Sequence, residues 1–141
     1  MAEHTMTVEV ASSPEEVFCH VADLTRLPDW DSSVRDARLV CDTGPALGRR
    51  YAVTIGFYGR ALDAEYEITG YERDRRIEWS ISGRVDGTTK IDLTPSAKGT
   101  RIDYRTEVKM RGLARLLDRG LKAALEGIGA NIASALERRF A

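Results

Sequence analysis

The stretch that decides the fold is residues 100–110, TRIDYRTEVKM, in which charged and uncharged side chains alternate. Every second residue from Arg101 to Lys109 is charged. Because successive side chains of a β-strand point to opposite faces of a sheet, this alternation predicts a strand with one face in water. The inward face is then formed by Ile102, Tyr104, Thr106, Val108 and Met110.

The chain before this stretch contains further runs of strand-type sequence. Turn residues such as Tyr58-Gly59 and Asp86-Gly87 separate the runs, so short turns join successive strands. Connections of this kind predict an antiparallel meander. The predicted strands cover residues 5–11, 34–41, 49–57, 60–70, 75–82, 85–94 and 100–110.

Alternation also assigns an inward face to the other strands, and this face is apolar and aromatic with a few hydroxyl groups and no charge. For the last two strands we expect Asp92 to face Arg101, because opposite charges across strands are each worth about 0.2–1 kcal/mol. The same register sets Lys90 opposite Asp103. The competing register sets Asp92 opposite Arg105, which also joins opposite charges. The expected inward residues are Tyr51, Val53, Ile55, Phe57, Leu62, Ala64, Tyr66, Ile68, Ile77, Trp79, Ile81, Val85, Thr89, Ile91 and Leu93.

Helical sequence flanks the strands. Ser13 can cap a helix, Pro14 suits the first helical position, and Glu16 completes a capping box, which predicts a helix to about residue 22. A further short helical turn is predicted over 25–30. Residues 113–140 carry apolar side chains three or four apart, which predicts one long helix lying on the sheet. Its expected buried side chains include Leu117, Leu121 and Leu125.

Composition limits the possible functions. A chain of 141 residues predicts a single domain over 1–141. Its 21 basic and 22 acidic residues lack the basic excess of a nucleic-acid surface. The longest uncharged stretch has ten residues, fewer than the ~20 of a membrane span, and residues 1–10 show no apolar leader, so we expect a cytoplasmic protein. Cys19 and Cys41 form no metal-binding pattern, so neither a metal nor another cofactor is expected.

The order of these elements, together with five sequence pieces, resembles the helix-grip fold of the START-like superfamily. The similarity is to the SRPBCC group of polyketide cyclase/dehydrase and lipid-transport proteins. It implies an α+β, birch-pollen-allergen-like fold, in which a curved seven-stranded antiparallel sheet wraps a long C-terminal helix and two short helices follow the first strand. The pieces are SPEEVF (13–18), LPDWD (27–31), GRALDAEYEITGYERDRRIEW (59–79), GTRIDYRTEV (99–108) and GLARLLDRGLKAALEGIG (112–129).

In that family a cavity lies between the sheet and the long helix, so the resemblance implies that some inward residues line a ligand pocket. Aromatic faces bury area and phenols offer hydrogen bonds, which suits a flat or polyketide-like ligand. For each aromatic residue, simple core packing is the alternative. The expected ligand-binding residues are Trp30, Tyr51, Tyr66, Trp79, Thr89, Tyr104, Thr106, Leu117 and Leu121.

The resemblance implies binding or transport of a hydrophobic small molecule, lipid-like or polycyclic. The alternative is a cyclase or aromatase that uses the same cavity, with tyrosines and Asp31 assisting proton transfer. A third hypothesis is an interaction protein that docks through a sheet edge or through the basic residues 111–119. His4 and His20 are expected at the surface, and no arginine is expected inward, so no catalytic residue is assigned. The oligomeric state stays open.

Overall fold

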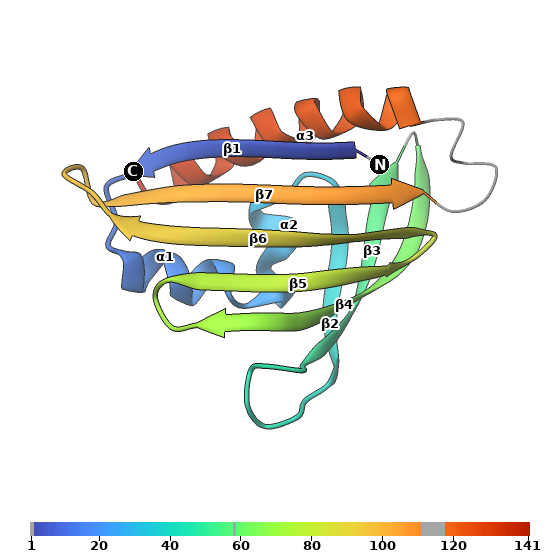
Figure 1. Cartoon of the computed structure of the whole chain (residues 1–141), viewed down its shortest axis with the longest axis horizontal. Helices are drawn as coiled ribbons and strands as arrows, with labels where there is room; N and C mark the ends of the chain where they lie inside the picture. The colour runs from blue at the N-terminus through green and yellow to red at the C-terminus, as the bar shows by residue number, and fades with distance from the viewer. Residues whose placement is uncertain (1, 58, 111–117) are drawn as a thin grey trace.

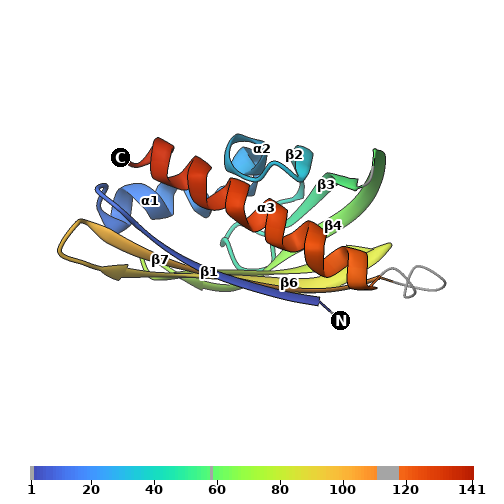
Figure 2. The ribbon, with the colours of Figure 1, turned by 90° about the horizontal axis from the view of Figure 1, so that it is seen from above.

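The fold is a single curved antiparallel sheet with all the helices on one side of it (Figures 1 and 2). A computed structural model describes residues 2–57, 59–110 and 118–141. The strand order is β1-β7-β6-β5-β4-β3-β2, so β1 and β2 are the two edges. The strands are β1 (Ala2–Val10), β2 (Val34–Cys41), β3 (Arg50–Phe57), β4 (Arg60–Glu72), β5 (Arg76–Gly83), β6 (Val85–Pro95) and β7 (Thr100–Met110).

Strands β2 to β7 follow one another as a meander, and β1 closes the order by pairing with β7. The helical elements are α1 (Pro14–Val21), the short 3-10 helix η1 (Leu24–Arg26), α2 (Leu27–Trp30) and α3 (Asp118–Arg139). This arrangement confirms the helix-grip fold that the sequence predicts. The strand limits also agree with the prediction to within a few residues.

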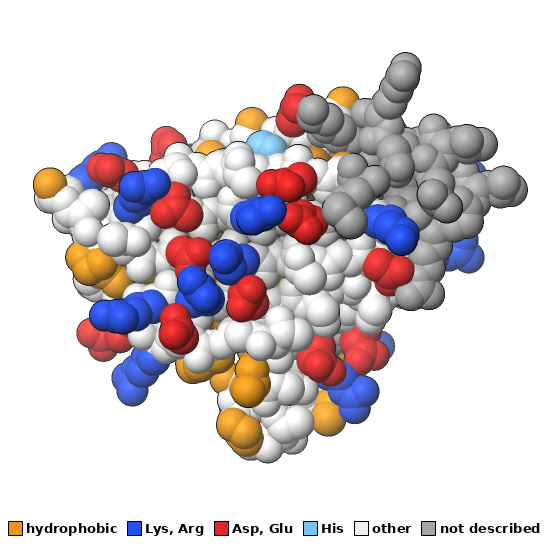
Figure 3. Space-filling view, viewed as in Figure 1, with side chains coloured by type: hydrophobic (Ala, Val, Ile, Leu, Met, Phe, Trp, Pro, Cys, Tyr) orange, Lys and Arg blue, Asp and Glu red, His pale blue; other side chains and the backbone are white. Residues whose placement is uncertain are grey.

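The alternation in β7 has the predicted consequence for burial. Ile102 and Tyr104 are buried, as are Thr106 and Val108, whereas Arg101 is exposed. On the outer face of the sheet, acidic and basic side chains lie intermixed (Figure 3). The inner face carries the core, which α3 and the short helices cover.

Helix α1 begins where the capping signal predicts. Ser13 has an extended backbone, and its hydroxyl accepts a hydrogen bond from the Glu16 N–H at 3.3 Å. Pro14, which has no N–H to leave unpaired, occupies the first turn. Asp23 caps the following 3-10 turn in the same way by accepting from the Thr25 N–H at 3.1 Å.

Helix α3 packs against β1 and α2. Its Ile132 and Leu136 are fully buried, and Leu125 is buried near the other end of the described side chains. The Phe140 carbonyl accepts hydrogen bonds from the N–H groups of Ala11 and Ser12, at 3.0 and 3.1 Å. The end of the helix is therefore fixed to the junction of β1 and α1.

The predicted register of β6 and β7 is wrong. Asp92 faces Asp103 rather than Arg101, and Lys90 faces Arg105. The prediction weighed only one pair of strands, whereas an inner strand has a neighbour on each side. Asp92 accepts a hydrogen bond from Arg76 on β5 at 2.7 Å, so its charge is balanced without β7.

Asp103 and Arg105 of β7, which face the like-charged Asp92 and Lys90, have their own partners on β1. Asp103 accepts from the Thr7 hydroxyl of β1 at 2.7 Å, and Arg105 lies 3.3 Å from Glu3. On the inner face this register sets the Thr89 and Thr106 hydroxyls 3.0 Å apart. Exposed ion pairs are each worth only about 0–1 kcal/mol, so they do not by themselves fix a register.

His20 also differs from the prediction, because it is buried rather than at the surface. Its Nδ1 lies 3.2 Å from an Arg26 guanidinium nitrogen, and its ring packs edge-on against Phe140. Burial lowers the pKa of this imidazole, and the charges of Arg139 and Arg26 lower it further. The neutral ring is thus a core side chain under the C-terminus.

Candidate ligand-binding cavity

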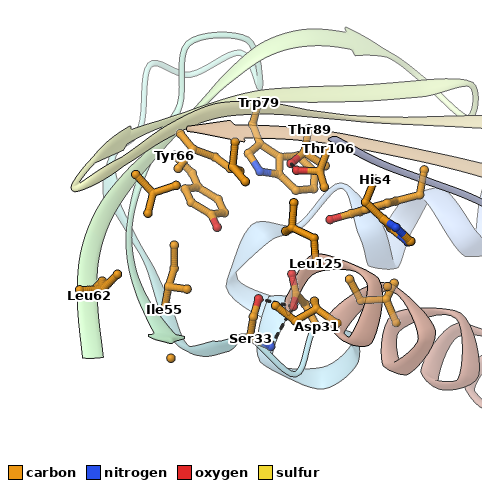
Figure 4. A pocket seen from close by; sticks show the side chains of 18 residues that line it. His4, Asp31, Ser33, Ile55, Leu62, Tyr66, Trp79, Thr89, Thr106 and Leu125 are labelled. Atoms are coloured by element: carbon orange, nitrogen blue, oxygen red, sulfur yellow. Dashed lines mark hydrogen bonds between the residues drawn. The ribbon is translucent and has the colours of Figure 1, made fainter. Parts of the chain in front are cut away.

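A cavity of about 70 Å³ lies between the inner face of the sheet and α3 (Figure 4). One wall consists of sheet residues and the other of α3, and the segment after α2 closes a third side. Most of the lining is apolar. From the sheet come Ile55, Leu62, Ile81, Val85 and Val108, and from α3 come Leu125, Ile128 and Ile132.

Aromatic side chains that carry a polar group, a phenol or an indole N–H, form part of the sheet wall. The rings of Tyr66 and Trp79 are stacked, with centroids 6.0 Å apart and an interplanar angle of 18°. Burial holds the pKa of Tyr66 well above its usual range, and the nearby Asp31 carboxylate raises it further. The Trp79 indole N–H is buried and has no hydrogen-bond partner in the described part of the chain.

Tyr104 lines the cavity next to a pair of threonines. Burial raises the pKa of its phenol, the Asp31 charge adds to the rise, and hydrogen bonding by Thr106 and Thr89 lowers it. The phenol is therefore a neutral hydrogen-bond donor at any physiological pH. The Thr89 and Thr106 hydroxyls bond to each other at 3.0 Å, so this part of the wall offers buried hydroxyl groups.

Asp31 brings a carboxyl group into this wall, from the turn that ends α2 (Figure 4). Its Oδ1 accepts hydrogen bonds from the Ser33 N–H at 3.0 Å and the Ser33 hydroxyl at 2.6 Å. Burial raises the pKa of the carboxyl group, and the two bonds from Ser33 oppose that rise. Asp31 lies outside the strands, so the alternation of the strands, which predicts only their own inward faces, says nothing of it.

His4 lines the cavity as well, contrary to the surface position expected for it. The first strand begins at Ala2 rather than at residue 5, so His4 falls on the same face as the buried Val8 and Val10. Its ring packs against the backbone of α3 at Gly129, where any side chain would meet the imidazole. The His4 Nε2 is buried without a partner among the residues described.

The structure brings five of the nine predicted ligand-binding residues together on the cavity wall: Tyr66, Trp79, Thr89, Tyr104 and Thr106. Trp30 lies behind this wall, with its ring edge-on to Tyr104 at 6.5 Å, and borders an outer groove instead. Tyr51 borders a separate surface groove near α1. Leu117 and the side chain of Leu121 lie outside the described residues.

Several lining residues were not singled out from the sequence as cavity residues. Gly129 and Ile128 lie on α3, and the spacing of apolar residues in that helix does not determine which of them face the cavity. Ser33 holds the Asp31 carboxyl through a turn, and turns carry no periodic signal. The DWDSS sequence, residues 29–33, holds the one available hint, since Asp and Ser readily form such local bonds.

Two other kinds of site find no support in the described ranges. They contain no group of three or more His, Cys, Asp or Glu side chains placed to hold a metal ion. Among their helices, none is both long enough and apolar enough to span a membrane.

No curated protein matches the chain. Among solved structures, a conserved protein from Geobacillus kaustophilus is 17% identical, with a TM-score of 0.79 over 98% of this chain and 94% of the other. A START superfamily protein from Mycobacterium smegmatis is 16% identical, with a TM-score of 0.77 over 99% and 97%. Ara h 8.0201 is 18% identical, with a TM-score of 0.65 over 95% and 96%.

At these identities the structural neighbours establish the fold alone. The model of one sequence family, described as polyketide cyclase/dehydrase and lipid transport, matches residues 1–141. That match spans the sheet, the short helices and α3, and so includes every element that lines the cavity. The chain therefore belongs to the polyketide cyclase/dehydrase and lipid transport family.

Proposed function

We propose that this protein binds a hydrophobic small molecule in the cavity between the sheet and α3. The observation that carries the proposal is the Trp79 N–H, which is buried on the cavity wall without a hydrogen-bond partner in the described residues. An unpaired buried donor costs about 1–3 kcal/mol, and a ligand oxygen or a trapped water recovers that cost. The remaining wall offers apolar contact, as small-molecule sites generally do.

The size of the cavity bears on the class of ligand. Drug-sized ligands occupy sites of about 300–1,000 Å³, several times the 70 Å³ found here. A single aromatic ring requires only limited adjustment of the walls, whereas a lipid chain or a polycycle requires α3 and the sheet to move apart. We therefore place small aromatic compounds first among the candidate ligands, with larger lipid-like or polycyclic ones binding only if the cavity widens.

The proposal is tested by native mass spectrometry of the protein purified from its own host, followed by a melting screen. A retained small-molecule mass identifies the ligand class directly. A ligand at 100 times its Kd adds about 2.7 kcal/mol to the free energy of unfolding. For a chain of this size each kcal/mol raises Tm by about 2–4 °C, so the expected shift is about 5–11 °C. If aromatic, sterol and lipid compounds all leave Tm unchanged and no mass is retained, the proposal fails.

A second candidate function is a cyclase-type enzyme that uses the same cavity. The observation favouring it is that Tyr66 and Tyr104 are held neutral next to the Asp31 carboxyl group. Two neutral phenols can donate hydrogen bonds to an oxyanion that develops on a polyketone, and the carboxyl group can take up a proton as a general base. Ring closure of a poly-β-ketone, measured by its new ultraviolet absorption, would support this function if Asp31→Asn abolishes it.

The cellular setting is also a proposal. Both cysteines are free thiols, and Cys19 is exposed. Free thiols persist in reducing compartments, so we propose a cytoplasmic location. Intact-mass measurement of alkylated protein from the host, with both thiols labelled, tests it; a disulfide-linked mass would contradict it.

A further inference from the structure

Asp31 provides the one carboxyl group on the cavity wall among the described residues, and the same lining contains no lysine or arginine. The side chain is 93% buried, since it exposes only 7% of its surface. Its Oδ1 is held by two hydrogen bonds from Ser33, which fix the orientation of the carboxyl group but supply no positive charge. Apart from His4, the described lining therefore offers this group no basic side chain.

A buried carboxylate is costly unless a positive charge accompanies it. A ligand that carries a cation into the cavity would supply that charge. The aromatic wall opposite suits such a ligand too, since the face of a Trp or Tyr ring attracts an ammonium group within about 6 Å. Trp79 and Tyr66 present a stacked pair of such rings, and Tyr104 presents a third.

We propose that the ligand of this cavity carries a basic nitrogen: an alkylammonium group whose N–H donates to Asp31 and whose aromatic or aliphatic body packs against Trp79 and Tyr66. The proposal rests on the proposed function, because it names the chemical class of ligand for the same cavity. A general apolar site needs no charge on its ligand, whereas this site requires an ammonium nitrogen in contact with a carboxylate oxygen of Asp31.

The competing state of the site is a protonated Asp31 that donates a hydrogen bond to a ligand carbonyl. Burial raises the pKa of this carboxyl group, which favours the protonated form in the empty cavity. The two states respond oppositely to pH. An ammonium ligand requires the ionised carboxylate, so its affinity rises as pH rises through the titration of Asp31. A ketone requires the neutral acid, so its affinity falls over the same range.

The other titratable groups that face Asp31 across the cavity are Tyr66 of β4, Tyr104 of β7 and His4 of β1. The phenols stay neutral throughout, and the lining residues described on α3 carry no charge. His4 is the one basic side chain in the described lining. A His4→Gln variant removes it, so the pH series is measured in this background as well.

The experiment compares benzylamine with benzyl alcohol, which has the same shape without the charge, and with acetophenone as the carbonyl probe. Affinities are measured by calorimetry for the full chain and for Asp31→Asn. Asp29→Asn is the matched control, because it removes the same charge two residues away, where the side chain is exposed and borders an outer groove. In Asp31→Asn the amide oxygen can still accept hydrogen bonds from Ser33, so this variant retains the turn.

A hydrogen bond to a charged group is worth about 1.5–3 kcal/mol, which corresponds to at least about a tenfold change in Kd. We expect benzylamine to bind at least about tenfold more tightly than benzyl alcohol, and Asp31→Asn to remove that preference. Asp29→Asn should leave both affinities unchanged. The affinity of the unaltered chain for benzylamine should rise with pH, and this arm needs no variant at position 31.

Equal affinity for the amine and the alcohol, an unchanged amine affinity in Asp31→Asn, or acetophenone binding that exceeds both and weakens as pH rises would each overturn the inference. In those cases the cavity still binds a small molecule, so the proposed function stands. If none of the three probes binds, and toluene does not bind either, the proposed function fails together with the inference.

Discussion

Two leucines of α3 allow a measurement of how hollow the interior is. Leu136 is fully buried away from the cavity, whereas Leu125 is buried but lines it. Leu→Ala in a packed core costs about 2.7–5.0 kcal/mol, because transfer energy is lost and a new void is left. We expect Leu136→Ala to fall in this range.

Leu125 already lacks partner atoms on the side that faces the cavity, so its removal forfeits fewer contacts. Leu125→Ala removes three buried carbon groups, and burying each one is worth about 0.8 kcal/mol. Because Leu125 contacts neighbours on only part of its surface, we expect the variant to lower the free energy of unfolding by less than about 2.5 kcal/mol. Leu125→Ala should therefore destabilise the protein less than Leu136→Ala does.

The assay is urea unfolding with linear extrapolation, and an unchanged m-value in both variants shows that the same surface is exposed on unfolding. A cost for Leu125→Ala equal to or above that for Leu136→Ala would refute the reasoning, because it would mean that the interior is solid at Leu125. The enlarged cavity of Leu125→Ala should also bind a bulkier aromatic ligand more tightly than the unaltered chain does.

Three further predictions concern other parts of the structure. Because burial raises the pKa of Asp31, the folded chain keeps this proton to higher pH than the unfolded chain. The free energy of unfolding should thus fall as pH rises from the ordinary Asp value of about 3.9 through the raised value, and Asp31→Asn should remove that fall in a urea titration at stepped pH. Thr106→Val should cost about 0.5–1.5 kcal/mol because the buried hydrogen bond between the Thr89 and Thr106 hydroxyls is lost, and the double variant Thr89→Val/Thr106→Val should cost less than the sum of the singles. Ser13→Ala should cost about 0.5–2 kcal/mol through loss of the α1 cap, seen as a lower urea midpoint at unchanged m-value.

The elements of this fold were predictable because local chemistry specifies them. Alternation in residues 100–110 fixes both the strand and its buried face, and the Ser13 cap with Pro14 fixes the start of α1. Short turns then leave a meander as the natural topology. Together with the long C-terminal helix, these features were enough for the resemblance to the helix-grip fold.

The register of β6 and β7 and the lining of the cavity were harder to predict from the sequence, because they depend on groups that meet only in the folded chain. Asp92 faces Asp103 because Arg76, on the strand beyond, balances the charge. His4 reaches the cavity because β1 extends further than its β-branched residues suggest. Asp31 enters from a turn, outside any periodic pattern, so the alternation argument did not include it.

Whether the space between the sheet and α3 accepts a small molecule is tested most directly by methyl NMR during titration with toluene. The methyl groups of Ile81, Val108, Leu125 and Ile132 line the cavity, whereas Val17 and Val21 are fully buried in α1 and do not. A ring entering the cavity must therefore shift the first set, saturably and with one common Kd, and leave the second set in place. Resonances of the cavity methyls that do not move at saturating toluene, or that move no more than those of Val17 and Val21, would contradict the proposed binding site.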